Sequence, residues 1–174
     1  MAAIAPSILV PGFVLRKGSG LDRALLVKFM QRTYRELLHP EQNFGHLAET
    51  VDRHLSSITP LWWVDAVDET WTGLPDLDTI SPLQPQPIAC LWLGNGIDQV
   101  QGKRYAHIML LYVAPEHRRQ GIGSALVRHA EQWARDRGDS KIGLQVFQNN
   151  QPALSLYEHL NYQTQAFWMV KVLG

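Results

Sequence analysis

The chain has little that points to a secreted or nucleic-acid-binding protein. Cys90 is its single cysteine among 174 residues, so no intramolecular disulfide can form, which is compatible with a reducing compartment. Its 16 Lys and Arg residues balance 16 Asp and Glu residues, so the composition indicates no basic surface for nucleic acid or anionic lipid. We therefore expect a cytoplasmic protein with neither nucleic acid nor membrane as a partner.

Long apolar runs are also missing. The first residues, AAIAPSILVPGFVL, are apolar but contain Pro6 and Pro11 and follow no basic residue, so they fit neither a signal peptide nor a membrane span. No H-E-x-x-H motif or cysteine-rich spacing occurs, and we expect no metal site. A chain of 174 residues is long enough for one well-packed core, so we expect a single domain over residues 1–174.

The most informative stretch combines an apolar run, a glycine-containing loop and an amphipathic helix. The apolar run over residues 107–113 stops before Pro115, which cannot easily continue a strand. The first turn of the following helix offers free N–H groups and a positive dipole end, and glycines let a bulky anion approach. We expect a diphosphate-binding loop made of Arg118, Arg119, Gln120, Gly121, Ile122, Gly123 and Ser124.

Two common phosphate motifs do not fit this loop. A P-loop requires Lys-Ser or Lys-Thr after its last glycine, and none follows here. The dinucleotide fingerprint requires a third glycine where Leu126 stands. It also requires an acidic residue after the next strand, but the apolar run 142–147 is followed by Gln148. A nucleotide-binding α/β domain is therefore only the third interpretation.

A third motif fits without a gap. Arg118-x-x-Gly121-x-Gly123 resembles the [QR]-x-x-G-x-[GA] motif of the GNAT superfamily of acyl-CoA-dependent N-acetyltransferases. A second block over residues 150–157 is similar to the family's N-x-x-A-x-x-L-Y segment, with Asn161-Tyr162 where Gly-Phe is usual. Asn tolerates the left-handed backbone that Gly provides after a helix. Two blocks in the right order make the resemblance specific.

The resemblance implies an α/β (α+β) fold with a mixed, mostly antiparallel sheet of six to seven strands and about four flanking helices. The family's fourth and fifth strands, which splay apart, would here be residues 105–113 and 141–148. The residues after Tyr162 have room for one long strand or two very short ones, so the family's last strand is expected to be merged or missing. Earlier strands are predicted at 13–17, 61–67 and 88–93, and helices after Ser19-x-x-Asp22, a capping box, and after Asn43.

One long segment has no periodicity. Residues 68–87 contain four prolines and Trp71, and loops of this length are often binding loops. Its place between two predicted strands makes it a candidate border of the acceptor site.

The resemblance further implies acetyl-CoA as a cosubstrate and no metal. The loop 118–124 would hold its diphosphate. Backbone groups of Leu111, Tyr112 and Val113, at the end of the splayed strand, would pair with the pantetheine amides. Asn150 would cap the helix that follows it, contact the cofactor together with Ala153, or do both.

Two residues are candidate catalysts. The resemblance implies that the Tyr157 hydroxyl protonates the departing thiolate, although Tyr157 also lies in an apolar helical stripe and is open to interpretation as a core aromatic. The strand 105–113 holds no Asp or Glu, which leaves His107, with an ordinary pKa of about 6.5, as its candidate base. A lone histidine in an apolar run is also commonly structural.

The resemblance predicts an N-acetyltransferase that transfers an acetyl group from acetyl-CoA to a primary amine of a small molecule, peptide or protein. The amine would attack directly in a ternary complex, on a monomer or homodimer. The alternative is a non-catalytic acyl-CoA-binding module of the same fold.

Overall fold

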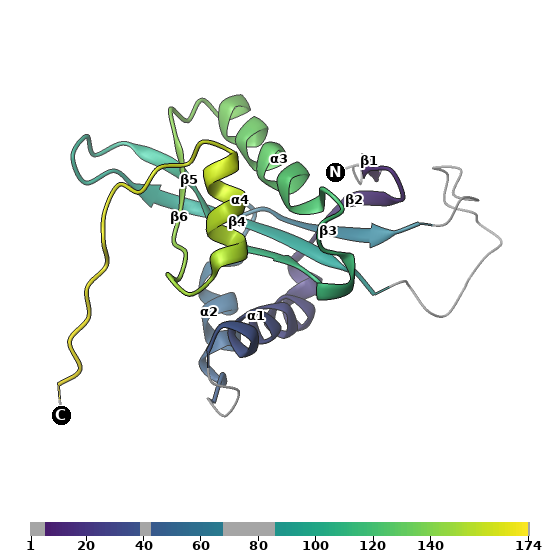
Figure 1. Cartoon of the computed structure of the whole chain (residues 1–174), viewed down its shortest axis with the longest axis horizontal. Helices are drawn as coiled ribbons and strands as arrows, with labels where there is room; N and C mark the ends of the chain where they lie inside the picture. Colours follow the sequence, from purple (N-terminus) through teal and green to yellow (C-terminus); the bar gives the residue numbers. More distant parts are fainter. Residues whose placement is uncertain (1–5, 39–42, 68–85, 174) are drawn as a thin grey trace.

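The computed structural model describes residues 6–38, 43–67 and 86–173. Its core is a sheet with helices on both faces (Figure 1). Most of the proline-rich segment, including Trp71, lies outside the described residues, and its role beside an acceptor stays a prediction. No helix in the described part of the chain is long and apolar enough to cross a membrane.

The described strands form one sheet in the order of the sequence. Every neighbouring pair is antiparallel except the last, which is parallel. The predicted mixed, mostly antiparallel sheet is thereby confirmed. The six strands are β1 (Ser7–Val10), β2 (Phe13–Lys17), β3 (Leu61–Ala66), β4 (Ala89–Ile97), β5 (Arg104–Val113) and β6 (Ile142–Leu144).

Helices α1 (Arg23–Leu37) and α2 (His46–His54) cover one face of the sheet, and α3 (Ile122–Asp136) covers the other (Figure 1). Each face buries its own apolar cluster, one centred on Trp63 and Trp92 and the other beneath α3. Helix α4 (Gln151–His159) completes the four predicted helices and lies against the start of α3. Burying both faces in this way is the general solution for an α/β sheet.

The parallel strands β5 and β6 are paired only over residues 106–108 and 142–144. Strand β5 then continues to Val113, whereas β6 ends at Leu144. The two strands therefore part as expected, but the strand predicted over 141–148 is much shorter than its apolar pattern indicated. An apolar run shows which residues avoid water and does not show where a ladder of hydrogen bonds stops.

The N-terminal edge differs from the prediction. A strand, β1, precedes β2 and is joined to it through Pro11 and Gly12, whose φ of 81° is left-handed. A Pro-Gly pair is typical of a tight turn, so this hairpin had a sequence signal that the strand prediction overlooked. The capping box of Ser19 and Asp22 is present as predicted.

Residues 163–173 form neither helix nor strand. The family's last strand is therefore missing from the described residues, one of the two outcomes expected. Large apolar side chains lie exposed there, among them Trp168 (79% exposed), Met169 (89%) and Val172 (88%).

Candidate functional site

The loop before α3 has an unusual backbone. A short 3-10 turn, Pro115–His117, follows β5, and Arg119 and Gly121 then adopt φ values of 64° and 82°. Gly121 accepts this left-handed geometry without steric cost, whereas Arg119 is strained by it. Left-handed residues within such a turn direct successive N–H groups to one side, which makes an anion-binding concavity.

The N–H groups of this loop are available. The first hydrogen bond of α3 runs from Ala125 N to Gly121 O, at 3.0 Å. Among the described residues, no backbone carbonyl accepts from the N–H groups of residues 119–124. No side chain caps the helix at Gly121 either. Free donors at a helix N-terminus, where the dipole is positive, fit a diphosphate.

The Arg118 side chain stabilises the loop through hydrogen bonds and does not point freely into it. Its Nε donates to Val113 O at 2.8 Å, and its Nη2 donates to Glu36 Oε2 at 2.5 Å. Its guanidinium also lies 5.7 Å from the centre of the Tyr112 ring. The Arg119 side chain is exposed and forms no salt bridge within the described residues, so it is the cation of this loop left for a ligand.

Glu36, at the end of α1, is a site residue that the sequence did not reveal. Its Oε1 accepts from the Tyr112 hydroxyl at 2.8 Å while its Oε2 accepts from Arg118. Asn149 Nδ2, in the loop before α4, donates to Leu37 O at 3.0 Å. The end of α1 thus contacts β5, the loop of residues 118–124 (the anion loop) and the loop before α4.

Burial and the hydrogen bond to Glu36 raise the pKa of Tyr112 to about 12.

The edge of β5 that faces β6 has no strand partner in the described residues beyond Ile108. Backbone groups of Leu111 and Val113 lie on this part of the strand, although Val113 O already accepts from Arg118 Nε. Unpaired backbone groups require other partners, which suits the predicted pairing with pantetheine amides. That pairing remains a prediction.

Helix α4 starts and ends as its sequence predicts. Asn150 Oδ1 accepts from Ala153 N at 3.3 Å, so Asn150 caps the helix. Asn161 has the left-handed φ of 64° expected at this position.

Tyr157 is 9% exposed, its ring centre is 5.6 Å from that of Tyr162, and burial raises its pKa to about 12. It therefore remains a protonated phenol at neutral pH.

His107 lies on β5 where the strand is paired on both sides. Its neighbours across the ladders are Gly94 and Gly143. Because Ile108 packs in the cluster under α3, the alternation of a strand directs His107 to the opposite face. Burial lowers the pKa of His107 below its ordinary value. The ring is therefore neutral at pH 7 and able to accept a proton.

The described part of the chain holds no group of three or more His, Cys, Asp or Glu side chains placed to bind a metal ion.

A mixed sheet whose parallel pair parts beside a helix start with free N–H groups is the arrangement that the acetyltransferase resemblance implied. Residues 56–162 match the model of the Acetyltransferase (GNAT) family. This match covers more than half of the chain, and the chain belongs to that family.

Curated relatives are similar in sequence to this chain over part of their length. The chain is 32% identical over 124 residues to N-acetyltransferase 8 from Homo sapiens, covering 62% of this chain and 54% of that protein. Streptothricin acetyltransferase from Streptomyces lavendulae is 44% identical over 50 residues, which are 29% of this chain and 26% of the relative. The chain thus spans about half or less of these relatives.

Solved structures share the fold over almost the whole chain. A putative acetyl transferase from Pyrococcus furiosus has a TM-score of 0.70 at 22% identity, covering 92% of this chain and 99% of that one. A predicted acetyltransferase with acetyl-CoA from Clostridium acetobutylicum has a TM-score of 0.68 at 18% identity, covering 92% and 96%. At these identities the likeness shows the fold alone.

The anion loop can be tested at Gly123. A Cβ there would lie 3.3 Å from Leu156 Cδ2, so valine would both obstruct a ligand and press on α4. We expect Gly123→Val to weaken CoA binding by about 100-fold or more, measured by calorimetry, because a diphosphate needs close backbone approach.

The double variant Gly123→Val with Leu156→Ala is the control, since it removes the contact with α4. It should stay folded in thermal melts and still fail to bind CoA. Recovery of wild-type affinity in the double variant would show that packing, and not the anion loop, is responsible.

Proposed function

We propose that residues 1–174 act as a single N-acetyltransferase domain that transfers an acetyl group from acetyl-CoA to a primary amine. The observation that carries the proposal is the set of free N–H groups over residues 119–124 at the start of α3. These donors would hold the diphosphate together with the exposed Arg119. The free edge of β5 would hold the pantetheine arm.

The transfer would proceed by direct attack in a ternary complex. The amine nitrogen bonds to the thioester carbonyl carbon, the carbon–sulfur bond breaks, and the amine loses one proton. Neutral His107 is our candidate to accept that proton. The Tyr157 hydroxyl is our candidate to protonate the leaving thiolate. Both roles need the neutral side chain, which burial favours in each case.

The acceptor is proposed as an amine of a small molecule, peptide or protein, and the enzyme as a cytoplasmic monomer or homodimer. Release of free thiol from acetyl-CoA, measured with a panel of aliphatic, aromatic and peptide amines, tests the activity. Thiol release that depends on an amine supports the proposal. Tight acetyl-CoA binding without turnover on any amine would favour the non-catalytic binding module instead.

Tyr157→Phe separates catalysis from packing. The phenyl ring keeps the contact with Tyr162 and removes only the hydroxyl, so acetyl-CoA affinity should change little. We expect kcat to fall by about 100-fold, the scale of a lost proton donor.

Steady-state kinetics with melting curves check this result, provided that acyl transfer limits turnover. Because the pKa of Tyr157 is raised to about 12, its proton is lost only as the pH rises toward that value. Wild-type activity should therefore show no alkaline loss from Tyr157 below about pH 10. A kcat within twofold of wild type in folded Tyr157→Phe would remove Tyr157 from the mechanism.

Glu36→Gln tests the ion pair between Glu36 of α1 and Arg118 of the anion loop. The amide can still accept from the Tyr112 hydroxyl, but the ion pair with Arg118 is lost. We expect the Kd for acetyl-CoA to rise by roughly 3- to 10-fold, since Arg118 is then held less firmly against Val113.

Glu49→Gln is the matched control for this change. Glu49 also pairs with an arginine, Arg53, but on the exposed surface of α2. Its removal should leave acetyl-CoA affinity unchanged. Equal effects of the two substitutions would indicate that overall charge, and not the ion pair between Glu36 and Arg118, controls binding.

A further inference from the structure

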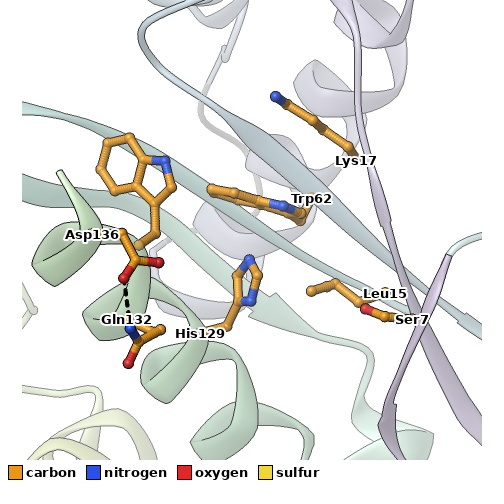
Figure 2. A pocket seen from close by; sticks show the side chains of 8 residues that line it. Ser7, Leu15, Lys17, Trp62, His129, Gln132 and Asp136 are labelled. Atoms are coloured by element: carbon orange, nitrogen blue, oxygen red, sulfur yellow. Dashed lines mark hydrogen bonds between the residues drawn. The ribbon is translucent and has the colours of Figure 1, made fainter. Parts of the chain in front are cut away.

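A hollow of about 260 Å³ lies on the flank of α3 between that helix and strands β1 to β3 (Figure 2). Its α3 residues include His129 and Asp136, which follow the start of the helix by 7 and 14 positions. At a rise of 1.5 Å per residue they lie about 10 and about 21 Å along the helix. The hollow is therefore separate from the anion loop at Gly121.

Aromatic side chains form a fixed wall in this hollow. Trp62 is 8% exposed, and its ring meets that of His129 edge-on, with ring centres 4.8 Å apart. Trp133 lies 6.2 Å from Trp62, also at a steep angle. The Arg137 guanidinium, 4.1 Å from the Trp133 ring centre, holds that indole in place. Such a wall suits a flat apolar group.

One buried ring nitrogen beside this wall has no hydrogen-bond partner in the described part of the chain. His129 Nε2 is buried and has no hydrogen-bond partner among the described residues. An unpaired buried group is unfavourable by about 1–3 kcal/mol. Burial lowers the pKa of His129, so the ring is neutral at pH 7. The His129 ring therefore contributes a neutral aromatic edge to the wall of the hollow.

Two opposite charges lie at separate ends of the hollow, Lys17 from β2 and Asp136 from α3 (Figure 2). Gln132 Nε2 donates to Asp136 Oδ1 at 2.7 Å, which orients the carboxylate. Within the described residues neither Lys17 nor Asp136 has an ion-pair partner, whereas the nearby Arg137 is paired with Asp139. A ligand that carries both charges would match the two ends.

We propose that this hollow is a second ligand site that takes a small aromatic zwitterion whose ammonium and carboxylate groups stand at opposite ends of its ring. The aromatic ring would lie against Trp62 and Trp133. The ammonium group would bind Asp136, and the carboxylate would bind Lys17. The volume of about 260 Å³ falls just below that of drug-sized pockets and fits a compound of this size.

Calorimetry with three probes tests the assignment. 4-(Aminomethyl)benzoate carries both charges at opposite ends of its ring, benzylamine lacks the carboxylate, and 4-methylbenzoate lacks the ammonium group. We expect 4-(aminomethyl)benzoate to bind most tightly, and each analogue to bind about fivefold more weakly or worse, the size expected of one partly exposed charge pair. Lys17→Met should reduce 4-(aminomethyl)benzoate affinity by a similar factor, and so should Asp136→Asn.

Arg128→Gln is the control variant, because Arg128 is an exposed residue of the same helix that does not line the hollow. It should bind 4-(aminomethyl)benzoate within twofold of wild type. Acetyl-CoA affinity should be unchanged in all three variants, so the result is independent of the proposed transferase activity. Absence of 4-(aminomethyl)benzoate binding at 10 mM, equal affinity for the three probes, or equal affinity in the Lys17→Met and Asp136→Asn variants would each overturn the assignment.

Discussion

The separation of β5 from β6 is the constraint on which the rest of the site depends. Pairing stops after Ile108 and Leu144, while β5 runs on to Val113. Backbone groups left without a ladder need another partner, and the parting strands place them beside the start of α3. A sheet paired to its end would satisfy those groups internally. The same parting leads the chain from β6 into α4, which brings Tyr157 to this region.

A second constraint comes from the opposite face of the sheet. Glu36 connects α1 to Tyr112 and Arg118, and Arg118 in turn holds Val113. The end of α1, the end of β5 and the loop before α3 therefore share one network of hydrogen bonds. Charge-assisted bonds of this kind fix geometry more firmly than neutral ones. The loop that offers its N–H groups is thus supported by a helix that carries none of the family motifs.

Burial sets the protonation states of the candidate catalysts. It raises the pKa of Tyr157 and lowers that of His107, because a low dielectric disfavours the charged form of either group. Burial therefore keeps Tyr157 a proton donor and leaves His107 a proton acceptor at neutral pH.

Local features of the site could be predicted because short-range sterics and hydrogen bonds control them. The left-handed Asn161, the cap at Asn150 and the capping box at Ser19 all follow from neighbouring residues. Contacts between distant segments could not be predicted in this way. Glu36 lies 76 positions from Tyr112, and an exposed helical glutamate carries no local sign of its partner. The length of β6 and the hollow beside α3 were likewise decided by packing, since both depend on which surfaces meet in the folded chain.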